Sequence, residues 1–217
     1  MKPLVPPGVY APQQDTALLA RALSDESVPV GAAVLDVGTG TGALALAAAR
    51  RGGRVTAVDV SWRAVFAARV NAARAGLHIR VLRGDLFAPV QGESFDLVLA
   101  NPPYVPAPGG RRRPRGAARA WDAGPNGRMV LDGICREVPA LLRPGGVLLL
   151  VQSALSDPGR TVGQLRAAGL KAAVVRRARI AFGPVVRGRE RWLRQRGLLS
   201  TTDQEEELVI IRAELAV

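Results

Sequence analysis

The sequence predicts an α/β fold with a doubly wound, mostly parallel, seven-stranded Rossmann-like sheet whose last strand is antiparallel. From residue 32 onward, short apolar runs alternate with Ala-rich stretches in which apolar residues recur at helical spacing. A glycine-rich segment follows the first apolar run, where a strand-to-helix turn is expected. Such alternation favours βαβ units, and ligands of these sheets bind at the carboxyl ends of the strands.

The individual elements follow from the same periodicities. Strand patterns cover residues 32–37, 54–60, 79–84, 95–100, 146–152, 171–177 and 207–215. Helical patterns cover residues 16–23, 42–51, 62–76, 128–146, 157–170 and 185–198. The third helix closes at Gly76, as a C-cap would, and the fourth is expected to tolerate or bend at Pro139 and to end at Pro144-Gly145-Gly146.

The length of 217 residues suits one domain spanning 1–217. Within it we expect an N-terminal extension and helix (1–30), an Arg/Gly/Pro-rich loop (105–127) and an insertion before the last strand (183–203). The loop is too long for an ordinary connection, so it is predicted to be either a functional lid or a disordered insertion. The insertion is predicted to hold an amphipathic helix that faces solvent or a partner more than the core.

Composition excludes several classes of protein. No apolar run approaches the roughly 18 residues of a membrane span, and the N-terminus lacks the features of a secretory signal, so we expect a cytoplasmic protein. Cys135 is the single cysteine and His78 the single histidine. An internal disulfide is thus excluded, and we predict no metal site. His78 lies between a helix pattern and a strand pattern, where a surface position is expected.

The formal net charge of +12 has two explanations. Basic surfaces gain affinity for nucleic acids by releasing counterions from phosphates. However, all but two of the 30 basic residues are arginine, in a chain rich in Ala, Gly and Pro. These residues have GC-rich codons, so coding bias also accounts for the charge, and composition alone does not choose between the two.

The segment Asn101-Pro102-Pro103-Tyr104 directly follows the fourth predicted strand. Its two prolines fix φ and remove two backbone donors, a rigidity that favours an active site over a plain turn. The Asn101 side-chain oxygen and the Pro102 carbonyl can each accept one N–H of a planar nitrogen, with Pro103 holding the two acceptors in register. Tyr104 can lie flat on the planar group. No general base is required.

The glycine-rich loop contains Gly38, Gly40 and Gly42, which allow a tight turn and a close approach to a ligand. A plain tight turn or a dinucleotide fold would also use such glycines. Three acids, Asp36, Asp59 and Asp85, end three successive strands and should share one rim of the sheet. They suit an ammonium group, a ribose and an adenine amino group, respectively. Each could instead cap a helix or a turn.

Together these segments resemble the class I S-adenosylmethionine-dependent methyltransferases, and within them the HemK/PrmC family of protein glutamine N5-methyltransferases. The likeness is carried by "VYAPQQDTALLARAL", "LDVGTGTG", "AVDV", "GDLF", "FDLVLANPPYVP", "AWDAGPNGRMVLDGI" and "ELVIIR". It points to the short HemK2/Mtq2-type branch. The resemblance implies a class I methyltransferase fold and transfer of a methyl group from S-adenosyl-L-methionine, leaving S-adenosyl-L-homocysteine. The implied target is the glutamine of a Gly-Gly-Gln release-factor motif.

The resemblance also implies roles for matching residues. Asp36, Gly38 and Gly40 would hold the methionine end of the cofactor, with Thr16 reaching its carboxylate. Asp15 and Thr16 also suit the start of a helix, so this role of Thr16 stays open. The full set of candidate cofactor-binding residues is Thr16, Asp36, Gly38, Thr39, Gly40, Gly42, Asp59, Val60, Asp85, Leu86 and Asn101. The candidate catalytic residues are Asn101, Pro102, Pro103 and Tyr104.

Two departures from the family leave the substrate open. Bacterial PrmC-type enzymes carry an N-terminal helical domain, whereas about 30 residues precede the first strand here. The arginine-rich run "GGRRRPRGAAR" is also unlike the usual family loop and could contact nucleic acid or the ribosome. The alternatives are therefore an N-methyltransferase acting on amino groups of DNA or RNA bases and a non-catalytic scaffold that binds the cofactor.

Two further expectations concern a partner and a loop segment. The resemblance implies a small zinc-binding activator of the Trm112 type as a possible partner, and no membrane partner is expected. Trp121 and the segment after it either close the substrate pocket or anchor the loop and start a helix at Asn126.

Overall fold

A computed structural model describes residues 2–109 and 116–216. Its seven strands form one sheet in the order β3-β2-β1-β4-β5-β7-β6, in which β7 runs antiparallel to both of its neighbours. The predicted fold class is confirmed, including the antiparallel last strand. The strands are β1 (Ala33–Val37), β2 (Arg54–Asp59), β3 (Ile79–Arg83), β4 (Phe95–Ala100), β5 (Leu142–Ser153), β6 (Leu170–Ala181) and β7 (Glu205–Leu215).

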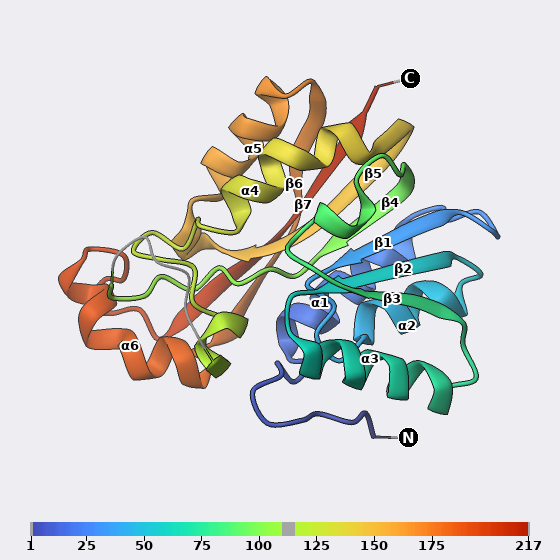
Figure 1. Cartoon of the computed structure of the whole chain (residues 1–217). Helices are drawn as coiled ribbons and strands as arrows, with labels where there is room; N and C mark the ends of the chain where they lie inside the picture. Colours follow the sequence, from blue (N-terminus) through green and yellow to red (C-terminus); the bar gives the residue numbers. More distant parts are fainter. Residues whose placement is uncertain (1, 110–115, 217) are drawn as a thin grey trace.

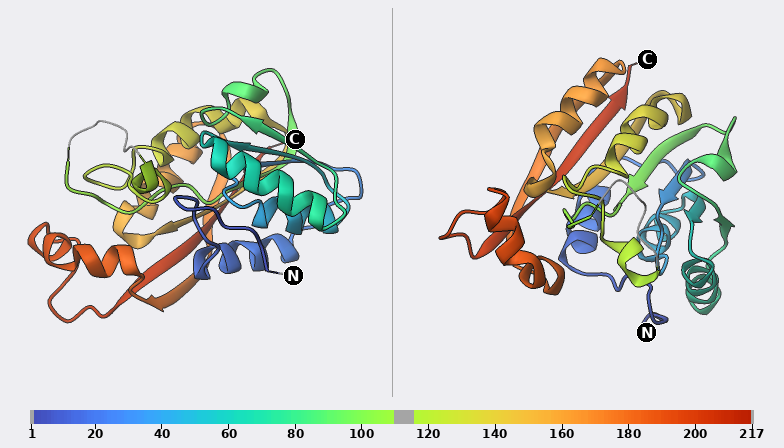
Figure 2. Two further views of the ribbon diagram at one scale, coloured as in Figure 1. Left: turned by 60° about the horizontal axis from the view of Figure 1, so that its bottom comes forward. Right: turned by 60° about the vertical axis from the view of Figure 1, so that its left-hand side comes forward.

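Helices cover both faces of the sheet (Figures 1 and 2). On one face lie α1 (Gln14–Asp25), α2 (Ala43–Arg50) and α3 (Trp62–Arg74). On the other lie α4 (Leu131–Glu137) and α5 (Pro158–Ala167). The sixth helix, α6 (Pro184–Gln195), connects β6 to β7 beyond the ends of the strands. Short 3₁₀ helices span Ala88–Val90, Gly116–Ala120, Val138–Leu141 and Ala154–Ser156.

Two apolar cores, one on each face, explain the continuous apolar runs of the central strands. In β1, Val34 packs into the core under α1, α2 and α3, whereas the next residue, Leu35, packs into the core under α4 and α5. Every residue of β1 is buried. A strand covered on both faces has no solvent-facing positions, so its sequence does not alternate between apolar and polar residues.

The predicted helix 128–146 is wrong in its extent. The α-helix α4 begins only at Leu131 and ends at Glu137, a 3₁₀ turn containing Pro139 follows, and β5 already begins at Leu142. Pro139 lacks the N–H that an α-helix would need and its ring obstructs the preceding turn, so the helix ends at this point.

The amphipathic helix predicted in 183–203 is confirmed as α6, and it faces solvent more than the core, since only Val186 and Leu193 are buried. Val186 and Leu193 are 2% and 0% exposed and belong to the core cluster on the α4–α5 face. One face of α6 is therefore anchored in the core, while Arg187 and Arg191 are exposed. Among the residues that the structure describes, no helix is long and apolar enough to cross a membrane.

Candidate active site

A cavity of about 830 Å³ lies at the carboxyl ends of the parallel strands. One side of it, the glycine-loop side, is formed where β1, β2 and β3 end. The opposite side, the β7 side, is formed by the end of β6, the start of α6 and Glu206 of β7. The segment before α1 borders both sides, since the Tyr10 carbonyl oxygen would lie 3.8 Å from a Cβ at Gly40. Asn101, Pro102, Pro103 and Tyr104 line the cavity between the two sides. The β7-side lining residues include Tyr10, Asp15, Ile180, Phe182, Val185 and Glu206.

The glycine loop turns tightly because three of its residues have positive φ. Gly38, Gly40 and Gly42 have φ values of 72°, 57° and 85°, which side-chain-bearing residues adopt only with strain. Gly38 and Gly40 line the cavity together with Thr39. Gly42 does not; an added Cβ there would lie 3.2 Å from Ala68, so this glycine permits close packing of α2 on α3.

Asp36 is a completely buried acid beneath this loop. Its Oδ2 accepts hydrogen bonds from the Thr39 hydroxyl (2.6 Å) and the Ala45 amide (3.0 Å). Its Oδ1 is buried with no hydrogen-bond partner in the described part of the chain. Burial raises the pKa of Asp36 to about 6, although both hydrogen bonds act in the opposite direction. Asp36 does not itself line the cavity, so its Oδ1 is an unsatisfied acceptor that lies beneath the glycine loop.

Asp59 and Asp85 lie on the same rim but in different environments. Asp59 accepts hydrogen bonds from the amides of Gly40 (2.9 Å) and Ser61 (2.8 Å), so it braces the glycine loop against the start of α3. Asp85 is exposed and lines the cavity with Val60 and Leu86. The backbone of Leu86 has φ of 46°, which is uncommon for a residue with a Cβ.

Thr16 and Asp15 connect α1 to the segment after β4. The Asn101 side-chain nitrogen donates to the Thr16 hydroxyl at 3.2 Å, and the Tyr104 hydroxyl donates to Asp15 at 3.1 Å. The Tyr10 hydroxyl also donates to Asp15, at 2.8 Å. The helix α1 begins at Gln14 with Gln13 at the N-cap, so Asp15 and Thr16 do not cap it. Their side chains instead hold the Asn101–Tyr104 segment.

Tyr104 is 8% exposed, and burial together with the nearby Asp15 carboxylate raises the pKa of its hydroxyl well above the usual range. Burial and Asp15 likewise raise the pKa of Tyr10. Both hydroxyls are therefore protonated donors at neutral pH, as their hydrogen bonds to Asp15 require.

The sequence analysis missed Glu206 on β7. This acid is 6% exposed and lines the cavity, although its neighbours Glu205 and Glu207 are exposed or half-buried. A signal was available, because Glu206 is in phase with Leu208 and Ile210, which are both fully buried. An acid at an inward-facing position of a strand marks a candidate binding residue.

The comparisons with known proteins bear on this site. The family model "Methyltransferase small domain" matches residues 4–110. A protein N5-glutamine methyltransferase from Methanocaldococcus jannaschii is 34% identical over 177 residues, which cover 81% of this chain and 88% of that protein. The chain belongs to the protein glutamine N5-methyltransferase family. It is thus an S-adenosylmethionine-dependent methyltransferase, and the resemblance found in the sequence is confirmed.

Two further relatives place the methyltransferase more closely. The release factor glutamine methyltransferase of Moorella thermoacetica is 39% identical over 175 residues, which cover 76% of this chain and 61% of that enzyme. The solved structure of the E. cuniculi Mtq2–Trm112 complex, which methylates the translation termination factor eRF1, is 25% identical with a TM-score of 0.68. That similarity covers 96% of this chain and 99% of the matched chain.

The segment after Tyr104 is tied back to the methyltransferase core by main-chain contacts. Val105 donates to the Trp121 carbonyl (3.0 Å) and accepts from the Ala123 amide (3.1 Å). Gly127 has φ of 70°, and a Cβ there would lie 2.3 Å from the Tyr104 carbonyl oxygen. Trp121 both lines the cavity and packs against the core, so its position is compatible with either of its expected roles. The helix expected to start at Asn126 begins five residues later, at Leu131.

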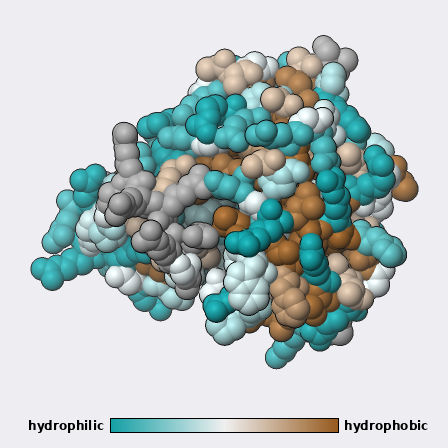
Figure 3. Space-filling model, viewed as in Figure 1, coloured by the Kyte–Doolittle hydropathy of each residue, from teal (hydrophilic) through white to brown (hydrophobic). Residues whose placement is uncertain are grey.

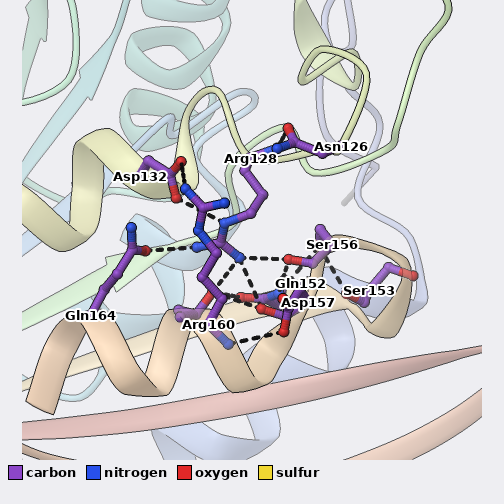
Figure 4. Close-up of polar contacts among 10 residues, drawn as sticks. Asn126, Arg128, Asp132, Gln152, Ser153, Ser156, Asp157, Arg160 and Gln164 are labelled. Atoms are coloured by element: carbon purple, nitrogen blue, oxygen red, sulfur yellow. Dashed lines mark hydrogen bonds and ion pairs between the residues drawn. The ribbon is translucent and has the colours of Figure 1, made fainter.

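Arg128 anchors this segment from below (Figure 4). Its side chain is 2% exposed and reaches both α4 and α5. It donates to Asp132, Thr161, Gln164 and the carbonyls of Ser156 and Asp157, at distances from 2.6 to 2.9 Å. Five acceptors surround the guanidinium group, three of them around Nη1, and the ion pair with Asp132 compensates the buried charge.

The surface of the methyltransferase is uneven. Figure 3 shows hydrophilic side chains over the α6 end of the face and hydrophobic ones gathered near α3. Trp62 and Phe66 of α3 are 60% and 54% exposed. Arg189 of α6 pairs with Asp122 and donates to the Pro106 carbonyl, which connects α6 to the loop after Tyr104. Most of the arginine-rich run "GGRRRPRGAAR" lies in 110–115, outside the described residues.

Proposed function

We propose that this enzyme methylates the side-chain amide nitrogen of a glutamine in a protein, most plainly the Gly-Gly-Gln motif of a release factor. The observation that carries the proposal is the state of Asn101. Its amide nitrogen is engaged by Thr16, which fixes the orientation of the side chain, and its amide oxygen accepts no hydrogen bond from the described residues. An oriented, unengaged acceptor in the cavity suits an N–H of the target amide.

The glycine-loop side fits S-adenosylmethionine. Asp36 Oδ1 is an unpartnered buried acceptor that matches the cofactor's ammonium group. Gly38 and Gly40, which have no Cβ, leave room for the methionine portion beside the loop. We assign the ribose hydroxyls to Asp59 and Val60, and the adenine to Asp85 and Leu86. Thr39 braces Asp36, Gly42 shapes the loop, and Thr16 reaches the cofactor carboxylate.

The bound cofactor supplies a methyl group on a positively charged sulfur, which is a strong electrophile. The protein has to present a weak nucleophile, because the lone pair of an amide nitrogen is delocalised. Asn101 and the Pro102 carbonyl accept the two N–H groups and stabilise the positive charge that develops on the nitrogen. Pro103 keeps these acceptors in register, and Tyr104, held by Asp15, lies against the planar amide. Pre-organisation thus replaces a general base in the transfer step. The methylated nitrogen would then be a strongly acidic cation that loses one proton to water, which leaves a neutral N-methylamide and S-adenosylhomocysteine.

The Mtq2 relative also suggests a partner. Because that protein is found in complex with Trm112, we propose that a small Trm112-like activator binds this enzyme as well. Co-purification of a stoichiometric small protein from the native host supports this proposal; full activity of the isolated chain, unchanged by host extract, contradicts it. The release-factor substrate places the reaction in the cytoplasm, where translation terminates.

The net charge favours a second candidate function, N-methylation of an amino group on a DNA or RNA base. Contacts between the basic surface and ribosomal RNA are also compatible with a release factor as substrate, so binding to RNA does not separate the two candidates. Binding that is equally strong at 50 and 500 mM salt would argue against any phosphate contact.

The deciding experiment is transfer of a radiolabelled methyl group from S-adenosylmethionine into a host lysate, followed by separate protease and nuclease treatments. The proposal predicts protease-sensitive label and, by mass spectrometry, a methylated glutamine in a release factor. Nuclease-sensitive label would establish the second candidate. Absence of any label, under conditions where calorimetry shows that the cofactor binds, would favour a scaffold.

A further inference from the structure

Glu206 is an acid on the β7 side that the methyl-transfer step does not use. The residue is 6% exposed, and it lines the cavity. The Ser153 hydroxyl at the end of β5 is a hydrogen-bond partner for it. Its second oxygen, Oε2, has no partner in the part of the chain that the structure describes. A buried acceptor left open toward a cavity points to a donor on a ligand.

The neighbouring groups cannot supply that donor. The hydroxyls of Tyr10 and Tyr104 are both committed to Asp15. Asp15 itself carries like charge, and together with burial it raises the pKa of Glu206. The β7 side therefore holds two buried acids, and the donors around them are directed to only one.

Glu206 lies on a different strand from the acids assigned to the cofactor. Asp36 lies on β1, whereas Glu206 lies near the start of β7, which β4 and β5 separate from β1 in the sheet. Ile180, Phe182 and Val185 contribute apolar surface to this part of the cavity, while the polar groups of Tyr10 and Asp15 are paired with each other. A substrate that reaches Asn101 from this side passes Glu206, the buried acid whose second oxygen has no partner among the described residues. Such a passage suits a narrow polar chain with N–H groups, like the backbone of a glycine-rich peptide.

We propose that Glu206 is a specificity residue of a substrate subsite, in which its Oε2 accepts an N–H from the substrate beside the methylated nitrogen. This inference rests on the proposed function, under which that donor is a main-chain N–H of the polypeptide next to the target glutamine. Asp15 shapes the subsite by holding Tyr10 and Tyr104 in place. Under this proposal Glu206 contacts the substrate and does not contact the cofactor.

The test uses Glu206→Gln, which preserves the shape of the side chain but places an NH₂ group among its polar atoms. The matched control is Glu205→Gln, the adjacent exposed acid on the same strand. With a Gly-Gly-Gln-containing release factor as substrate, we expect Glu206→Gln to raise KM at least tenfold. The Kd for S-adenosylhomocysteine, measured by calorimetry, should stay within twofold. Glu205→Gln should behave as the wild type in both measurements.

A second variant, Glu206→Leu, is needed because the amide oxygen of the introduced Gln could still accept the substrate N–H. Leucine has no hydrogen-bond acceptor in its side chain. If both variants are folded by circular dichroism and keep the wild-type KM, the subsite is overturned. A rise in the Kd for S-adenosylhomocysteine equal to the rise in KM would also overturn it, since Glu206 would then act through the cofactor.

Failure of the proposed function gives a different result. If the wild-type enzyme labels nucleic acid and no protein in the lysate, the glutamine proposal falls. The same lysate then tests the subsite: weaker labelling by Glu206→Gln than by Glu205→Gln supports an N–H contact with the base, and equal labelling overturns it.

Discussion

The two sides of the cavity are built in different ways. The glycine-loop side is made from consecutive strand ends, and its polar groups are fixed by short-range contacts such as Asp36 with Thr39 and Asp59 with Ser61. The β7 side is assembled from segments far apart in the chain, as the contact between Tyr104 and Asp15 across 89 residues shows. A small cofactor can be bound by one short, continuous sequence motif, as on the glycine-loop side. A protein substrate needs a larger surface, which on the β7 side is formed by segments from different parts of the chain.

The largest expected effect is on the support of the segment after Tyr104, which lies between the two sides. Arg128→Leu should lower the free energy of unfolding by about 3–5 kcal/mol, because it leaves buried carbonyls and Asp132 without their cation. Chemical denaturation measures the change. Arg136→Leu on the neighbouring helix α4 is the control; its side chain is 71% exposed and should contribute less than about 1 kcal/mol. Equal losses in the two variants would show that the Arg128 contacts add little.

Asn101→Ala is expected to separate chemistry from cofactor binding. Loss of one pre-organised group in the reaction centre lowers kcat by about 100- to 1000-fold. The Kd for S-adenosylhomocysteine should change less than threefold, since Asp36 and Asp59 are untouched. Single-turnover transfer and calorimetry provide the two numbers. If kcat and the affinity for S-adenosylhomocysteine fell by the same factor, Asn101 would act in cofactor binding instead.

Asp36→Asn tests the glycine-loop side through pH. The folded pKa of about 6 lies above the unfolded value of 3.8, so ionisation of Asp36 is disfavoured in the fold. Stability from this group is present below pH 3.8 and lost as the pH rises through 6. The variant should therefore be more stable than the wild type at pH 7.5, by up to about 3 kcal/mol. Thermal unfolding at pH 5 and pH 7.5 measures the difference.

The same acid predicts the pH dependence of ligand binding. The cofactor ammonium pairs with ionised Asp36, so the affinity of the wild type for S-adenosylhomocysteine should rise from pH 5 to pH 7.5. Asp36→Asn should bind at least tenfold more weakly at pH 7.5 and lose this dependence. A variant that retained the wild-type profile would assign the titration to another group.

Tyr10→Phe should have the smallest effect. It removes one of the two tyrosine donors to Asp15, and Tyr104 still donates to the same carboxylate. A hydrogen bond to a charged group contributes about 1.5–3 kcal/mol, and the half-buried position of Tyr10 places the loss at the lower end. The KM for the protein substrate should rise less than tenfold. If the Kd for S-adenosylhomocysteine changed instead, Tyr10 would contribute to cofactor binding and not to substrate binding.

The contrast between the two sides also governs what sequence could predict. The alternation of strands and helices, the positions of Asp36 and Asp59 and the rigid segment from Asn101 to Tyr104 followed from local periodicity and spacing, whereas the strand order is given by the structure alone. The buried Arg128 did not follow, because most of its partners lie 28 to 36 residues away in the sequence. Glu206 was missed although its burial is in phase with that of Leu208 and Ile210. The end of α4 was misplaced because apolar periodicity continued past Pro139 into β5, and a pattern of buried residues alone does not distinguish a helix from a buried strand.

The first helix carries a consequence for synthesis of the chain. Glu26, just after α1, pairs with Arg212 of β7, which leaves the ribosome 186 residues later. All candidate cofactor-binding residues are therefore synthesised long before the last two strands. The end of α1 cannot form its ion pair with β7 until Arg212 has been synthesised. A nascent chain in this interval carries an unfinished sheet edge at β5, so the step most exposed to aggregation is the closing insertion of β7 between β5 and β6.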